Sequence, residues 1–288
     1  MFEQLSTTIE GINLSANFYK ALGDEKPFTL FCLPGGGSSA EFFDLHPDYS
    51  FVKRMNSLGY NVITMDHPGT ASNQLPFNQP FLKPRIAAEY IALALAEWNK
   101  GALIGVGHSM GGMTTTLIQA KSKAFKAIAL LGSNAGGLDW GLNDHERTYI
   151  DKPDRFSEDI ENLVYTKFGC EFTEIPSGPS GNSITFGGQT EILTARLREI
   201  SCELYAAGGL MSMIRGSFSE EVKAIDTSIF FACGDNDIGI PPAEIEKYYS
   251  NASNTKLVIL KNTGHNHFAF DSISFLCESL DYWASNLA

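Results

Sequence analysis

The sequence has few positive charges for its length. Its 288 residues include 21 Lys and Arg against 33 Asp and Glu, which gives a formal net charge of -12. Nucleic acids and anionic membrane surfaces bind clusters of Lys and Arg, so the charge argues against both as partners. A run of about 18 apolar residues, long enough to cross a membrane, is also missing. We therefore expect no membrane insertion.

Two further absences concern the amino terminus and the cysteines. The first residues, MFEQLSTTIEGINLS, lack a basic segment followed by an apolar one. They do not resemble a secretory signal, so we expect a cytoplasmic location. The five cysteines lie far apart with no C-x-x-C pair, which argues against a metal or redox site and predicts reduced, mostly buried thiols. They are Cys32, Cys170, Cys202, Cys233 and Cys277.

Short apolar runs recur along the chain. Each has the length of a strand, and most are separated by segments long enough for a helix, which predicts a mostly parallel, twisted sheet with helices on both faces. An alternating stretch around Gly11 predicts a hairpin before them, and 85–101 predicts a helix that stops at Gly101. The predicted strands are 28–34, 60–66, 102–108, 126–132, 228–234 and 256–262.

This alternation breaks between about residues 134 and 220. The segment has no clear buried strand, is rich in charge at first, and ends in an amphipathic stretch. We interpret 134–220 as a mainly helical insertion, and 1–133 with 221–288 as one α/β core.

A glycine-rich turn, LIGVGHSMGG at 103–112, follows one predicted strand and precedes a predicted helix. It comes close to the G-x-G-x-x-G of dinucleotide-binding folds, but Met110 stands where the third glycine is needed. The turn also lies in mid-chain, and no acidic residue follows about 20 residues later to bind a ribose. The stretch 107–111 matches G-x-S-x-G completely, a turn in which small residues leave room around a strained serine.

A serine hydroxyl needs a base to become a nucleophile, and the base needs a partner that fixes its tautomer. His265 follows the last predicted strand at the carboxyl edge of the sheet, with His267 as its near rival. The preceding strand is followed by Asp235 and Asp237. The order Ser109, Asp, His is that of a hydrolase triad, but the residues alone leave both pairs open.

Acyl transfer also needs two N–H donors for the developing oxyanion. The amide of Met110, directly after the serine, is one candidate. The loop after the first buried strand, LPGGGSS, offers the others from Gly35, Gly36 and Gly37.

With these features in order, the sequence resembles the α/β-hydrolase superfamily over nearly all of the chain outside the insertion. GHSMGG is similar to its nucleophile turn, and MDHPGTAS at 65–72 resembles its D-x-x-G-x-G-x-S stretch, with Ala71 in place of the second glycine. GDNDIGIPP and TGHNHF resemble its G-x-x-D-x-x-x-P and G-H motifs. The resemblance selects Asp237 over Asp235 and His265 over His267.

One motif departs from this pattern. The usual H-G before the oxyanion residue is Pro34-Gly35 here, a version similar to that of type II thioesterases, although the rest of the loop is not close. By position the resemblance makes Gly36 the oxyanion donor and leaves Gly37 possible.

In the superfamily the insertion is a lid over the active site. Apolar residues near its end are candidates to line an acyl pocket, with Tyr205 and Met211 singled out, although such a stripe also suits simple lid packing. They are Leu204, Tyr205, Leu210, Met211, Met213 and Ile214.

The sequence therefore predicts a serine hydrolase that cleaves an ester, thioester or related acyl bond of a small, partly apolar substrate. Its triad is Ser109, Asp237 and His265, with Gly36 and Met110 forming the oxyanion hole. Serine as nucleophile argues against dehalogenase and epoxide hydrolase chemistry. The resemblance implies no cofactor and no metal. The alternatives are a C–C hydrolase or lyase on the same triad, or a non-catalytic small-molecule receptor.

Overall fold

The computed structural model describes residues 2–138, 141–174, 187–239 and 241–287. Within these residues, one eight-stranded sheet has the order β1-β2-β6-β3-β7-β8-β11-β12. Neighbouring strands from β6 to β12 pair in parallel, whereas β1 and β2 pair antiparallel at one edge. The predicted mostly parallel sheet is confirmed. Its strands are β1 (Glu3–Ile9), β2 (Ile12–Tyr19), β3 (Phe28–Leu33), β6 (Asn61–Thr64), β7 (Ala102–His108), β8 (Phe125–Leu131), β11 (Ser228–Gly234) and β12 (Thr255–Leu260).

The predicted opening hairpin is formed by β1 and β2. Glu10 and Gly11 at its turn have φ of 49° and 81°, the left-handed values that suit a tight two-residue turn between twisted strands. All six predicted buried strands occur within two residues of their expected bounds.

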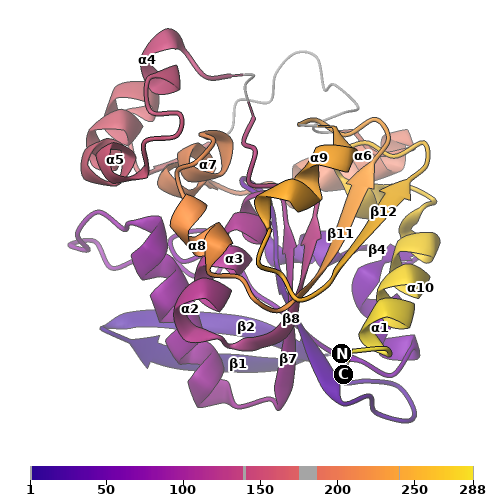
Figure 1. Cartoon of the computed structure of the whole chain (residues 1–288). Helices are drawn as coiled ribbons and strands as arrows, with labels where there is room; N and C mark the ends of the chain where they lie inside the picture. Colours follow the sequence, from indigo (N-terminus) through magenta and orange to yellow (C-terminus); the bar gives the residue numbers. More distant parts are fainter. Residues whose placement is uncertain (1, 139–140, 175–186, 240, 288) are drawn as a thin grey trace.

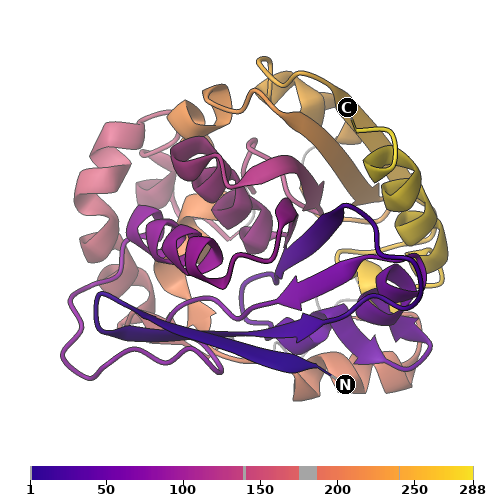
Figure 2. The ribbon, with the colours of Figure 1, turned by 90° about the horizontal axis from the view of Figure 1, so that it is seen from below.

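Helices cover both faces of the sheet, as Figures 1 and 2 show. Successive side chains of β3 enter different cores: Phe31 and Leu33 join α2 and α3, whereas Leu30 and Cys32 join α1 and α10. This alternation is the period of two that a doubly covered strand requires. The helices are α1 (Phe51–Ser57), α2 (Pro84–Trp98), α3 (Met110–Ser122), α9 (Pro242–Ile245) and α10 (Ile273–Ala284), with 3₁₀ turns η1 (Ala40–Phe43), η2 (Glu246–Tyr248) and η3 (His267–Ala269).

Helix α2 ends earlier than the sequence suggested. Its C-cap is Asn99, which takes a left-handed φ of 45° and donates its N–H to Leu95 O. Asn tolerates this conformation, so the helix stops two residues before Gly101.

The segment between β8 and β11 is mainly helical in its described part. Figure 1 shows α4, α5 and α7 at the end of the molecule toward which β11 and β12 point. The helices of the segment are α4 (Asp144–Arg147), α5 (Pro153–Phe168), α6 (Glu191–Glu199), α7 (Ala206–Met213) and α8 (Ser219–Lys223).

Two short pairs of strands lie outside the main sheet in the described part of the chain. They are β4 (Asp44–His46) with β5 (Tyr49–Ser50), and β9 (Phe172–Thr173) with β10 (Leu204–Tyr205).

Candidate active site

Ser109 occupies the turn between β7 and α3. Its φ of 52° and ψ of -120° are strained for a residue with a side chain. The turn is held in place because Ser109 N donates to Leu131 O at 2.9 Å and Gly112 N donates to Ser109 O at 2.9 Å. A strained serine at the carboxyl end of a central strand is the geometry that the sequence motif predicts.

The glycines around Ser109 provide space. A Cβ on Gly107 would lie 2.4 Å from Gly111 O, and one on Gly111 would lie 2.2 Å from Leu33 O. Both neighbours are backbone atoms that cannot move aside. Neither position can therefore carry a side chain while β7, α3 and β3 approach this closely.

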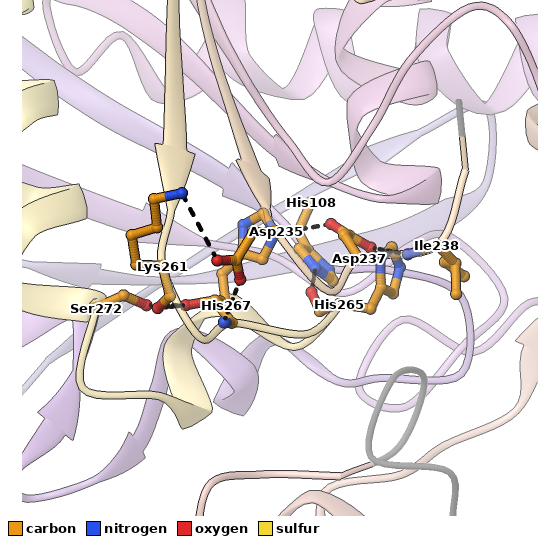
Figure 3. Close-up of polar contacts among 9 residues, drawn as sticks. His108, Asp235, Asp237, Ile238, Lys261, His265, His267 and Ser272 are labelled. Atoms are coloured by element: carbon orange, nitrogen blue, oxygen red, sulfur yellow. Dashed lines mark hydrogen bonds and ion pairs between the residues drawn. The ribbon is translucent and has the colours of Figure 1, made fainter. Parts of the chain in front are cut away.

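The loops after β11 and β12 bring Asp237 and His265 together (Figure 3). Nδ1 of His265 lies 2.6 Å from Oδ1 of Asp237, and the N–H of Ile238 donates to the same oxygen at 2.7 Å. Asp235 is turned away: its Oδ1 accepts the N–H of Thr263 at 3.1 Å. Of the two candidate acids, Asp237 is thus the one that contacts His265.

The rival histidine also contacts this acid. Nε2 of the fully buried His267 lies 2.9 Å from Oδ2 of Asp237, so one carboxylate has a histidine on each oxygen. A third imidazole, His108, lies beside both, with ring centroids 4.8 Å from His265 and 5.5 Å from His267. Nε2 of His108 lies 2.7 Å from the carbonyl oxygen of His265 and must donate to it, because a carbonyl only accepts.

These contacts determine the charges of Asp237 and His108. Burial by itself raises the pKa of Asp237, but the charge of His265 and hydrogen bonds from both histidines outweigh it and hold the pKa well below its ordinary value. Asp237 is therefore an anion at neutral pH and can only accept hydrogen bonds. Burial, followed by repulsion from His265 and His267, lowers the pKa of His108 well below its ordinary value, so His108 is neutral.

Ser109 and His265 both lie beside the end of β8. Ser109 N bonds to Leu131 O, and a Cβ on the next residue, Gly132, would lie 3.3 Å from Nδ1 of His265. With Nδ1 bound to Asp237, Nε2 of His265 is the nitrogen left for a second partner. No hydrogen bond joins the side chains of Ser109 and His265, both of which lie in the described part of the chain.

The loop after β3 lies against the serine. A Cβ on Gly35 would be 3.2 Å from Cβ of Ser109. The preceding carbonyl is fixed, because Nε2 of the buried His67 donates to Pro34 O at 2.8 Å. Burial lowers the pKa of His67. The sequence does not predict the contact between His67 and Pro34, since nothing in the spacing connects the two positions.

Three backbone amides near Ser109 have no partner among the described residues. They belong to Gly36, Gly37 and Met110. A Cβ on Gly36 would be 3.5 Å from Sδ of Met110, so the loop and the start of α3 lie side by side. On its other side the loop joins the segment before β10, because Cys202 N and Ser201 Oγ both donate to Gly37 O, at 3.0 and 3.1 Å.

The stretch 65–72 is hydrogen-bonded to the end of this loop. The buried carboxylate of Asp66 accepts the N–H of Ala40 at 2.5 Å and the hydroxyl of Ser72 at 2.5 Å. Ala71, which replaces a glycine of the family motif, keeps a left-handed φ of 43°. The backbone shape that favours glycine is therefore kept without it.

The two residues singled out for substrate binding are both buried. Tyr205 is 2% exposed, and its hydroxyl donates to Leu82 O. Met211 is 1% exposed and belongs to the core around α7. Leu204 is half-buried and lies against the loop after β3, since a Cβ on Gly36 would be only 2.6 Å from its Cδ1.

Among the described residues, no group of three or more His, Cys, Asp or Glu side chains is arranged to hold a metal ion. No helix there combines the length and the apolar character needed to cross a membrane.

The sheet order, the strained serine between strand and helix, and the two loops at the same edge define an α/β-hydrolase fold. The sequence matches the model of the Alpha/beta hydrolase family over residues 30–272, and the chain belongs to that family. No curated protein matches it significantly.

Solved structures share the fold at low identity. The structure of DcsB in complex with its substrate analogue has a TM-score of 0.68 and 17% identity, with all of both chains covered. The thioesterase domain from the curacin biosynthetic pathway has a TM-score of 0.65 and 16% identity, covering 98% of this chain and 99% of that one. A malate-bound thermophilic esterase from Thermogutta terrifontis has a TM-score of 0.64 and 13% identity, covering 100% and 99%.

Proposed function

We propose that this α/β-hydrolase is a serine hydrolase that cleaves an ester, thioester or related acyl bond of a small, partly apolar substrate. The observation that carries the proposal is the contact of Asp237 with Nδ1 of His265 beside the strained turn of Ser109. A neutral imidazole whose Nδ1–H is held by a carboxylate has its Nε2 lone pair free to act as a base.

In the proposed reaction, Oγ of Ser109 attacks the acyl carbon while Nε2 of His265 takes the hydroxyl proton. The charge that develops on the carbonyl oxygen is stabilised by the free N–H groups of Met110 and Gly36, with Gly37 as the alternative to Gly36. The bond to the leaving group then breaks as His265 gives it the proton, which leaves an ester on Ser109. Water, deprotonated by His265, attacks this acyl-enzyme, and Ser109 regains its proton as the acid leaves.

The segment 134–220 is proposed as the lid over this site. Its support is the contact of Leu204 with the loop at Gly36 and the backbone bonds from 201–202 to Gly37. An apolar side chain at this position limits the space beside the reacting carbonyl, which suits an apolar acyl group. Tyr205 and Met211 belong to the same segment and are buried.

The test compares Ser109→Ala with Ser122→Ala, which removes a hydroxyl from the far end of the same helix. We expect Ser109→Ala to reduce kcat/KM for activated aryl esters by about 10³-fold or more, with little change in Tm, and Ser122→Ala to keep most activity. An initial burst of phenol equal to the enzyme present would reveal the acyl-enzyme. Equal activity of both variants would refute the role of Ser109. Inactivity of the wild type toward all esters and thioesters would favour the C–C hydrolase, lyase or receptor alternatives.

A further inference from the structure

Asp237 accepts more hydrogen bonds than a triad requires. Its Oδ1 accepts from His265 Nδ1 at 2.6 Å and from Ile238 N at 2.7 Å, and its Oδ2 lies 2.9 Å from Nε2 of His267. Both histidines come from the turn after β12, and His267 N donates to His265 O at 3.0 Å. One short segment thus supplies both of the histidines that contact the carboxylate (Figure 3).

The direction of the bond from His267 follows from the charge of its partner. An ionised carboxylate has no proton to give, so Nε2 of His267 must carry the hydrogen. Its other nitrogen, Nδ1, is buried and has no partner among the described residues. The only hydrogen bond of this side chain in the described structure is therefore the one to Asp237, although the ring is 0% exposed. Burying Nδ1 without a partner costs free energy of folding, and within the described structure the hydrogen bond to Asp237 is the contact that offsets this cost.

We propose that His267 is a positioning residue: its Nε2–H holds Oδ2 of Asp237 so that Oδ1 stays aligned with Nδ1 of His265. This inference rests on the proposed function, because it assigns His267 a role in preparing His265 to act as a base. Without His267, Oδ2 would lose its donor and the carboxylate would be held on one oxygen only, by Ile238 N and His265.

The bond also affects how strongly Asp237 favours a protonated His265. A donor on Oδ2 withdraws negative charge from the carboxylate, whether His267 is neutral or protonated, so its removal leaves more charge facing His265. The other titratable groups that face this cluster are His108 from β7 and Cys233 from β11. Both are uncharged at neutral pH, because burial lowers the pKa of His108 and raises that of Cys233 to about 12.

The experiment compares three variants of the full chain. His267→Leu removes the donor, and His267→Gln places an amide N–H near the position of Nε2. His46→Leu is a control at a half-buried histidine of β4 whose Nδ1 accepts the N–H of Asp48 rather than contacting Asp237. For His267→Leu we expect kcat to fall by about 10- to 100-fold at nearly constant KM. This range is taken by analogy from residues that orient the side chains of metal sites through hydrogen bonds. The acid limb of kcat/KM against pH should move to higher pH. His267→Gln should keep at least about a tenth of kcat and the wild-type acid limb, and His46→Leu should match the wild type.

A measurement on the wild type keeps the inference testable if His267→Leu does not fold. In protein labelled with ¹⁵N-histidine, the proton of His267 should be found on Nε2 at neutral pH, as the bond to Asp237 requires. A proton on Nδ1 alone would overturn the inference. So would a folded His267→Leu variant with unchanged kcat and an unchanged acid limb. Failure of the proposed function would instead appear as an inactive wild type, which leaves the ¹⁵N result unaffected.

Discussion

Replacing Asp237 by Asn keeps the shape of the side chain and removes its charge and one of its acceptors. The carboxylate accepts three N–H groups, from His265, Ile238 and His267. An amide has one acceptor oxygen, so its NH₂ must face one of the histidines. If it faces His265, that ring is driven into the wrong tautomer. In either orientation the amide no longer offsets the positive charge that forms on His265 during the reaction.

The size of the expected effect follows from these two losses. The same change in a Ser-His-Asp triad lowers kcat on the order of 10⁴-fold, which corresponds to about 5 kcal/mol of transition-state stabilisation. Here the buried position of Asp237, with a side chain 6% exposed, prevents water from replacing the missing charge. His265→Gln, which removes the base, should be similarly inactive.

The matched control is Asp235→Asn, two residues away. The oxygen of an Asn can still accept the N–H of Thr263, and among the described residues the substitution loses one ion pair, a 3.9 Å contact with the exposed Lys261. We expect at least about a tenth of the wild-type rate, because exposed ion pairs contribute little. The assay is kcat/KM on one aryl ester at a pH above the acid limb, with circular dichroism to verify folding. An inactive Asp235→Asn beside an active Asp237→Asn would refute this account of the loop.

Three further predictions concern space, specificity and pH. Gly107→Ala should lower the free energy of unfolding by about 1–3 kcal/mol in urea titrations, because its Cβ would lie 2.4 Å from Gly111 O, a backbone atom. A variant as stable as the wild type would contradict the predicted clash. Leu204→Ala should move the optimum over a series of aryl esters to longer acyl chains, since Leu204 lies against Gly36; an unchanged length profile would remove Leu204 from the pocket. The lowered pKa of Asp237 stabilises the fold fully above its ordinary value of 3.8, and this contribution is lost as pH falls toward the folded-state pKa. Tm should therefore fall more steeply below about pH 4 in the wild type than in Asp237→Asn, and parallel curves would argue against it.

Much of the fold could be predicted because buried parallel strands have a strong local signal. Runs such as 102–108 and 228–234 are apolar throughout and coincide with β7 and β11. The serine turn was predictable for the same reason, since its glycines follow directly on a strand. The two-residue strands β9 and β10 were not, because their pairing joins residues about 30 positions apart and leaves no periodic pattern.

Contacts between distant loops were the least predictable part of the site. From the sequence, His265 and His267 are alternative candidates for the catalytic base, whereas both contact Asp237 in the structure. That arrangement depends on the turn after β12, where residues two apart face the same carboxylate. The bond from His67 to Pro34 likewise depends on two loops meeting at the sheet edge. The roles of the triad, the 134–220 boundary and the cytoplasmic location remain predictions.

The most direct test of the central claim is covalent labelling of Ser109. A fluorophosphonate reacts with an activated serine, so we expect one adduct per chain, located by peptide mapping on Ser109 and absent from Ser109→Ala. Labelling should be much slower in His265→Gln, because the base is missing, and nearly unchanged in Asp235→Asn. A label on another residue of the native protein, or no label at all, would contradict the claim that Ser109 is the nucleophile.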